Sequence, residues 1–215
     1  PQGGLVAYCG DSLLRSVDGG ATWQTLGRIA AGQVHAVLVS PYDPNMIYLG
    51  GQNLYVSKDG GKSWAERSNG LGGTRLELKL NPWDSSTMYV QEDECQFNRD
   101  QRLYSSIDGG RSWMSVTERG CGLAFDADRN TLYRYEMSQR SERGRSRDNG
   151  TTWDWRNVPP IKNGLLNIAT HPQSARTVFA FSGEPPYVFL STNSGDSWQP
   201  SSGITTRYGN MQTMA

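Results

Sequence analysis

The fold is decided by the stretch Ser57-Lys58-Asp59-Gly60-Gly61-Lys62-Ser63-Trp64, because its pattern occurs five times in the 215-residue chain. The copies begin at Ser16, Ser57, Ser106, Ser146 and Ser191, so successive serines are 41, 49, 40 and 45 positions apart. Four copies read Ser-x-Asp-x-Gly-x-[Ser/Thr]-Trp. The fifth copy has Asn193 in place of Asp, and it has Ser194 at the next position, where the first three copies have Gly. A period of this length is typical of repeat architectures in which each repeat is one small structural unit.

Each copy is expected to form a turn between two strands. Apolar or aromatic residues precede the serine, as in Leu54-Tyr55-Val56, and the Trp begins the next strand. The Asp carboxylate accepts hydrogen bonds from nearby turn amides, Gly supplies a positive φ, and Trp buries a large apolar area. Asn keeps the acceptor oxygen, so the fifth turn is expected to form but to be looser. The residues assigned a structural role are Ser16, Asp18, Gly20, Trp23, Ser57, Asp59, Gly61, Trp64, Ser106, Asp108, Gly110, Trp113, Ser146, Asp148, Gly150, Trp153, Ser191, Asn193, Gly195 and Trp198.

This octet resembles the Asp-box, or BNR, repeat of sialidases, xyloglucanases, sortilin-type receptors and photosystem II assembly factors. The resemblance extends over the whole chain, since the copies begin between Ser16 and Ser191. Those proteins are β-propellers whose box turns lie on the rim opposite the ligand face. The resemblance therefore implies an all-β propeller with its ligand site on the other rim. By association it also implies an exported protein, extracellular or periplasmic.

The segments around the boxes predict five four-stranded antiparallel blades in one domain, residues 1–215. Four blades are expected at 34–68, 75–117, 122–158 and 165–201, and the first combines 1–26 with 210–215. Pro1-Gln2 aligns with Pro172-Gln173, which precedes a second strand, so the first blade lacks its inner strand at the start of the chain. We expect the strand 210–214 to supply it by pairing with the N-terminal blade. Such pairing would close a five-bladed propeller and protect its sheet edges.

Composition excludes several partners. The chain has 21 Lys+Arg and 21 Asp+Glu, so its net charge of zero argues against nucleic-acid binding. No apolar run is long enough to span a membrane, and no leader peptide is recognisable. Cys9, Cys95 and Cys121 lack metal-ligand spacing, so neither a metal site nor a cofactor is expected. Two alternatives stay open for the cysteines, which are a disulfide between Cys95 and Cys121 or three free thiols.

Candidate ligand residues are expected on the rim opposite the boxes. The long connection 92–101 of the third blade begins with Glu92, Asp93 and Glu94, and a basic stretch, 137–145, follows in the next blade. These acids are either a source of catalytic groups or calcium ligands, or a solvated loop paired with the basic stretch. Every link between blades carries a cation, which would favour an anionic ligand if all of them faced the channel. These cations are Arg28, Arg75, Arg119, Lys162 and Arg207, and the tyrosines expected on this rim are Tyr187 and Tyr208.

Three functions are consistent with these patterns. The first is a non-catalytic binding propeller that recognises a glycan or another anionic ligand through the rim opposite the boxes, with no catalytic residue assigned. The second is a glycoside hydrolase, sialidase- or xyloglucanase-like. Sialidases carry an Arg-Ile-Pro motif ahead of their first box, whereas Gly27-Arg28-Ile29-Ala30 lacks the proline and follows it. The third is a protein-binding assembly scaffold. The sequence predicts no oligomeric state.

Overall fold

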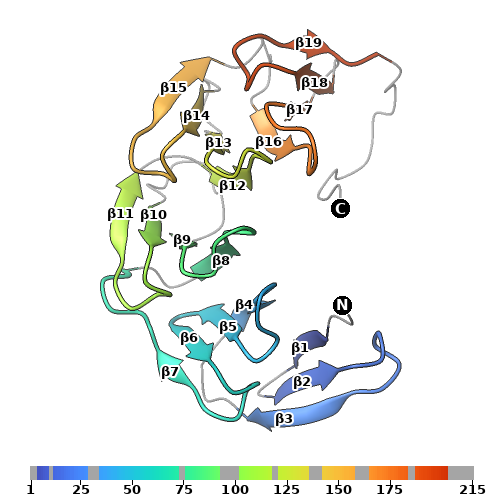
Figure 1. Ribbon diagram of the computed structural model, residues 1–215, viewed down its shortest axis with the longest axis vertical. Helices are drawn as coiled ribbons and strands as arrows, with labels where there is room; N and C mark the ends of the chain where they lie inside the picture. Colours follow the sequence, from blue (N-terminus) through green and yellow to red (C-terminus); the bar gives the residue numbers. More distant parts are fainter. Residues whose placement is uncertain are drawn as a thin grey trace. The chain divides into compact units, whose positions relative to one another are not determined.

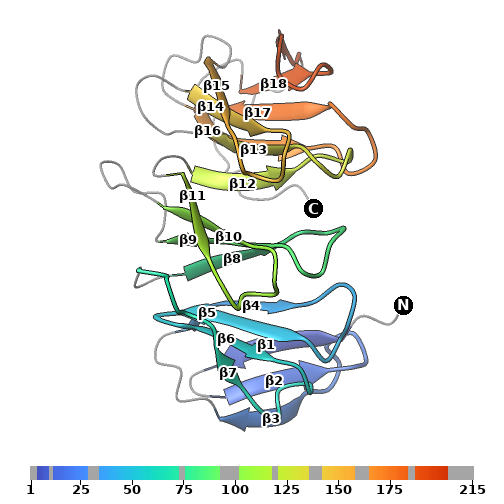
Figure 2. The ribbon, with the colours of Figure 1, turned by 60° about the vertical axis from the view of Figure 1, so that its left-hand side comes forward.

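The computed structural model describes residues 4–9, 12–28, 34–72, 76–92, 102–117, 121–135, 142–157, 165–183 and 187–202. These residues form β-strands and no helix, and therefore contain no helix that could cross a membrane. The strands make five antiparallel sheets, shown in Figures 1 and 2. The chain divides into two compact units, Pro1–Gln96 with Gln101–Thr117 and Phe97–Asp100 with Glu118–Ala215.

The first unit contains three sheets. They are formed by β1 (Leu5–Cys9), β2 (Ser12–Ser16) and β3 (Gln24–Arg28); by β4 (Val34–Val39), β5 (Ile47–Gly51), β6 (Leu54–Ser57) and β7 (Ala65–Glu66); and by β8 (Leu76–Leu80), β9 (Met88–Glu92), β10 (Leu103–Ser106) and β11 (Met114–Thr117). In each sheet, strands consecutive in sequence are neighbours. Consecutive neighbours in antiparallel order make an up-and-down meander, which is the topology of a propeller blade.

The second unit contains two sheets with the same topology. One is formed by β12 (Cys121–Phe125), β13 (Leu132–Tyr135), β14 (Glu142–Ser146) and β15 (Asp154–Asn157), and the other by β16 (Leu165–Thr170), β17 (Val178–Ser182), β18 (Val188–Ser191) and β19 (Gln199–Pro200). The predicted all-β fold of antiparallel blades is thus confirmed. The strand predicted at 210–214 lies outside the described residues, so the pairing that would close the ring stays a prediction.

Strand register confirms that the five sheets are copies of one unit. The box serine always pairs with the first residue of the preceding strand: Ser16 with Leu5, Ser57 with Ile47, Ser106 with Met88, Ser146 with Leu132 and Ser191 with Val178. The strand β1 therefore corresponds to β5, which is the second strand of its blade. This correspondence explains why the first described sheet has three strands while the others have four.

Apolar clusters join the sheets of the first unit. Leu13 of the first sheet packs with Ile47 and Leu49 of the second. A second cluster joins the second sheet to the third and contains Tyr48, Leu54, Val56, Leu76, Leu78, Met88 and Val90. At Gly50 the two sheets approach so closely that a Cβ atom would lie 2.4 Å from the carbonyl oxygen of Leu76. Only glycine fits at this position without a backbone shift.

Hydrogen bonds within each box fix its turn as expected. The serine Oγ accepts a bond from the Gly amide at 2.7–2.8 Å and donates to the Asp or Asn side chain at 2.7–2.9 Å. The same acceptor oxygen receives the amide of the Ser or Thr that precedes the Trp, at 2.9–3.0 Å. The bond from the serine to its acceptor is 2.9 Å in the fifth box and 2.7–2.8 Å in the others, so the turn around Asn193 forms as expected, while the looser turn stays a prediction. Asn193 Nδ2 donates to Ser197 Oγ at 2.9 Å, which replaces the hydroxyl-to-carboxylate bond of the other boxes.

Candidate functional site

Most of the predicted ligand residues lie outside the described part of the chain. They are Arg75, Asp93, Glu94, Arg119, Lys162, Arg207 and Tyr208. Of the others, Arg28 ends β3, Glu92 ends β9, and half-buried Tyr187 precedes β18, so these three belong to three different sheets. Cys9 is a free, exposed thiol, and the pairing of Cys95 with Cys121 is not tested. The ligand residues therefore stay predictions.

Two sides of each sheet can be distinguished from its topology. The box turns connect the third and fourth strands, and we call this end of the sheets the box side. The turn between the second and third strands lies at the other end, which we call the opposite side. In the second sheet the opposite side carries the turn at Gln52, and in the fifth it carries Tyr187. Tyr187 is therefore on the side where the sequence predicts ligand binding.

The box carboxylates are fully engaged within their own turns. The hydroxyl and amide of Thr22 lower the pKa of Asp18 to about 2, and those of Ser63 lower the pKa of Asp59 to about 2. The pKa of Asp108 is held well below its usual range by Ser112 in the same way. Burial disfavours ionisation of Asp148, but its hydrogen bonds outweigh that effect and its pKa is lowered too. All four are carboxylates at neutral pH, so none can serve there as a general acid.

A shallow depression lies on the box side of the second and third sheets. It lies between the turns that follow β4 and β8 and is lined partly by Tyr42, Tyr48 and Asp84. It encloses almost no space for even a water molecule, whereas a typical small-molecule pocket has a volume of roughly 300 Å³. The Asp84 carboxylate is already occupied by bonds from Ser86 and Thr87, which lower its pKa. The depression is therefore a poor candidate for catalysis or ligand binding.

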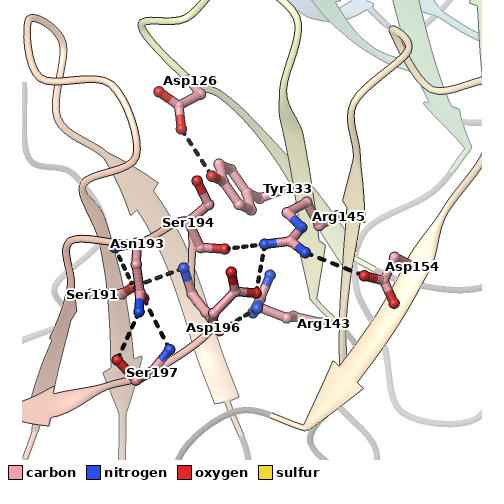
Figure 3. Close-up of polar contacts among 11 residues, drawn as sticks. Asp126, Tyr133, Arg143, Arg145, Asp154, Ser191, Asn193, Ser194, Asp196 and Ser197 are labelled. Carbon is pink, nitrogen blue, oxygen red and sulfur yellow. Dashed lines mark hydrogen bonds and ion pairs between the residues drawn. The ribbon is translucent and has the colours of Figure 1, made fainter.

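The densest buried polar cluster lies in the second unit and is shown in Figure 3. Arg143 and Arg145 extend from one face of β14 and are 0% and 4% exposed. Arg145 donates to the Ser194 carbonyl oxygen at 3.0 Å and to Asp196 Oδ1 at 2.8 Å. It also donates to Asp154 Oδ2 at 3.2 Å, so one guanidinium joins the fourth sheet to the fifth box. Hydrogen bonds to charged groups are the stronger ones in proteins, and those to Ser194 and Asp196 link residues about fifty positions apart in sequence.

Arg143 replaces a tryptophan interaction of the other boxes. In the first, second and fourth boxes, the Trp Nε1 donates to the carbonyl oxygen of the box Gly at 3.0–3.1 Å. In the fifth box Arg143 donates to the Gly195 carbonyl oxygen, and its guanidinium lies 5.8 Å from the centre of the Trp198 ring. The buried Trp198 Nε1 has no hydrogen-bond partner among the described residues. In the fifth box, a cation–π contact between Arg143 and Trp198 therefore replaces the hydrogen bond that the Trp indole donates in three other boxes.

A second buried contact connects the two sheets of this unit. Asp126 is 0% exposed and accepts bonds from the Tyr133 hydroxyl at 2.8 Å and from the Arg176 amide at 3.0 Å. Burial raises the pKa of Tyr133, which therefore stays a hydrogen-bond donor at neutral pH. Arg134 lies on the other face of β13, and its burial lowers its pKa to about 9. The network is a structural connection between blades rather than an open reaction centre.

The sequence analysis missed this cluster because it considered Arg143 and Arg145 as partners of the acidic connection 92–101 and not as buried residues. Both residues lie in β14, as the blade pattern predicts for a third strand, and Arg145 pairs with Asp154 and Asp196. A signal was present in the repeat, since Arg143 and Arg145 occupy the positions of the buried Leu54 and Val56. Charged residues at core positions need partners on the neighbouring blade.

Among the described residues, no three His, Cys, Asp or Glu side chains come together in a group that could hold a metal ion.

Comparison with solved structures relates the fold to known proteins. An ancestral GH74 enzyme aligns with a TM-score of 0.68 and 20% identity, covering 92% of this chain and 29% of the enzyme. YCF48 from Cyanidioschyzon merolae aligns with a TM-score of 0.63 and 16% identity over 92% of this chain and 71% of YCF48. YCF48 bound to D1 peptide aligns at 0.51 and 16% identity, covering 87% and 73%. At such identities the likeness shows the fold alone.

Comparison of sequences gives the family. No curated protein sequence matches the chain. The model of the Sortilin-Vps10 family, described as sortilin, neurotensin receptor 3, matches residues 11–144, which is more than half of the sequence. The chain, whose sheets have the fold of a β-propeller with Asp-box repeats, belongs to the Sortilin-Vps10 family.

Proposed function

We propose that this chain is a non-catalytic binding propeller that holds a segment of another polypeptide on the opposite side of its sheets. One observation carries the proposal: every described carboxyl with a shifted pKa accepts hydrogen bonds within its own turn, and these bonds lower the pKa. These carboxyls are Asp18, Asp59, Asp84, Asp108, Asp128 and Asp148. A glycosidase acid needs a raised pKa to stay protonated at neutral pH. The shifted groups have the character of turn-stabilising carboxylates.

The polypeptide ligand is favoured by the comparisons. The family model bears the name of a neurotensin receptor, and the fold is shared with YCF48, which has been solved with a D1 peptide. A propeller that binds an extended peptide uses loops on a rigid scaffold. The box turns satisfy their own acceptors, which leaves the turns of the opposite side as the better source of ligand contacts. Tyr187 is the described residue we assign to that contact.

A glycan or another anionic ligand is the second candidate, favoured by the likeness to the GH74 enzyme. If the ligand is anionic, Arg28 and the other cations in the links between blades bind its negative charge. The chain spans 29% of that enzyme, and the described carboxyls with shifted pKa values have them lowered, whereas a glycosidase acid needs a raised pKa. We therefore rank binding above hydrolysis for both ligand classes.

The architecture we propose for this function is a five-bladed ring closed by the segment 210–214. We also propose that the chain acts after export, in an extracellular, periplasmic or lumenal space. The support for export is membership of a family named after a receptor. Both points can be tested separately from ligand binding.

Two parallel screens test the function. The purified chain is selected against a displayed random-peptide library and applied to a glycan array, alongside Arg28→Ala, Tyr187→Ala and the box-side control Lys58→Ala. We expect peptide binding that Tyr187→Ala weakens at least tenfold and Lys58→Ala leaves unchanged. Binding to glycans alone, lost in Arg28→Ala, would replace the polypeptide by the second candidate. A folded chain that binds neither class, or hydrolyses a glycan, would contradict the proposal.

A further inference from the structure

One asparagine of the chain stands in a sequence that accepts N-linked glycans. Asn149-Gly150-Thr151 has the form Asn-x-Thr with a residue other than proline in the middle. No other asparagine of the 215 residues has Ser or Thr two positions later. The motif marks a surface position in an exported protein, where a bulky glycan is tolerated. The motif lies in the box turn of the fourth sheet, between β14 and β15.

The turn places Asn149 at an exposed position. Asn149 lies between Asp148 and Gly150 in the connection from β14 to β15, and its φ is 54°. Asparagine adopts this left-handed region more readily than other side-chain-bearing residues. Three other boxes have glycine here, namely Gly19, Gly60 and Gly109, with φ between 70° and 74°. The turn therefore requires a backbone conformation at this position and no particular side chain.

The bonds that close the fourth box come from other residues. Ser146 Oγ accepts the Gly150 amide at 2.7 Å, and Asp148 accepts both the amide and the hydroxyl of Thr152. At Gly19 and Gly109, which correspond to Asn149, an added Cβ would meet no atom within 4 Å, and at Gly60 it would make ordinary contacts of 3.4 Å with Arg15 and Asn45. The box turn thus has room for a side chain at this position, and Asn149 is exposed there. The fold can carry a large substituent there without breaking the turn.

From the sequence motif, the exposure of Asn149 and the room that the box turn has for a side chain at this position, we propose that Asn149 is an N-glycosylation site. The inference rests on the export that forms part of the proposed function. The donor is a lipid-linked oligosaccharide diphosphate, and an oligosaccharyltransferase catalyses the transfer. Asn149 Nδ2 forms a bond to C1 of the first sugar, and the bond from C1 to the diphosphate oxygen breaks. The lipid diphosphate leaves with the bonding electrons, and the amide nitrogen loses one proton.

The position of the glycan fits the proposed ligand site. Asn149 is on the box side, whereas Tyr187 is on the opposite side of its sheet. A glycan on Asn149 covers the box side and leaves the opposite side accessible. We therefore expect glycosylated and deglycosylated protein to bind the same polypeptide with affinities within twofold of each other.

The test is to secrete the full chain behind a cleavable leader from eukaryotic cells and to analyse it with and without peptide N-glycosidase. The enzyme converts a glycosylated Asn149 to Asp, which peptide mass spectrometry locates. The matched variant is Asn149→Gly, because glycine occupies this position in three other boxes and preserves the turn. Thr151→Ala removes the motif, Thr151→Ser retains it, and Asn130→Gln changes an asparagine outside any such motif.

We expect a glycan on wild type, Thr151→Ser and Asn130→Gln, and none on Asn149→Gly and Thr151→Ala. Secreted, folded wild type without a glycan would overturn the inference, as would a glycan that persists in Asn149→Gly. The two proposals fail separately: glycosylated protein that binds no ligand contradicts the proposed function alone, whereas unglycosylated protein that binds a polypeptide contradicts this inference alone.

Discussion

The serine of an Asp-box is predicted to stabilise its turn by accepting a buried amide, and Ser57→Ala tests this directly. Ser57 is 0% exposed, and its Oγ accepts the Gly61 amide at 2.8 Å while donating to Asp59 Oδ1 at 2.8 Å. Gly61 is itself buried, so water cannot replace the lost acceptor. Alanine leaves that amide without a hydrogen bond.

The expected loss of stability follows from the cost of a buried amide without an acceptor, which is larger than the net gain from a typical hydrogen bond. Leaving one buried donor unsatisfied costs about 1–3 kcal/mol of unfolding free energy. For a chain of this size each kcal/mol lowers the thermal midpoint by about 2–4 °C. The exposed neighbour Lys58 makes a matched control, since a surface substitution changes stability by about 0.5 kcal/mol or less.

The assay is urea unfolding followed by tryptophan fluorescence, with a thermal scan by circular dichroism on the same variants. We expect the Ser57→Ala midpoint to fall well below those of wild type and Lys58→Ala, with an unchanged urea slope. If Ser57→Ala unfolds within about 0.5 kcal/mol of wild type, the buried amide does not depend on Ser57 and the reasoning is refuted.

Three further predictions concern charge and packing. The box aspartates have lowered pKa values in the folded protein, so their contribution to stability is predicted to be constant from pH 7 to about pH 5. This contribution is lost as the pH falls from the unfolded pKa of 3.8 through about 2, and a urea midpoint that already falls between pH 7 and 5 would contradict the prediction. Asp59→Asn should keep the fold, because Asn193 performs the same role, and should reduce this acid dependence in a pH series of urea midpoints. Gly50→Ala should cost about 1–3 kcal/mol in urea unfolding, because its Cβ would lie 2.4 Å from the Leu76 carbonyl oxygen; a neutral effect would show that the sheets can separate without cost.

The repeat could be predicted from sequence because the interactions that define it are local. In each box the serine, the Asp or Asn and the Gly lie within four positions of each other, so the pattern itself encodes the hydrogen bonds. The order of strands followed, since consecutive segments of a meander pair with their neighbours. In the fifth box an amide takes the place of the carboxylate, and Asn193 Nδ2 donates to Ser197, a bond that a pattern of acceptors alone does not predict.

The buried arginines could not be predicted in the same way. Arg145 meets Ser194 and Asp196 across about fifty positions, and Arg143 reaches Gly195 across a similar separation. Such contacts depend on how two blades face each other, which a single repeat does not specify. Aligning the repeats would have placed both arginines at core positions, but it would not have named their partners.

The most direct test of the proposed function is a hydrogen-exchange footprint of the chain with a peptide selected from the displayed library. Slower exchange is predicted at the turn of the opposite side around Tyr187, with unchanged exchange in the box turns, which already hold their own hydrogen bonds. Protection confined to the box turns would contradict the account.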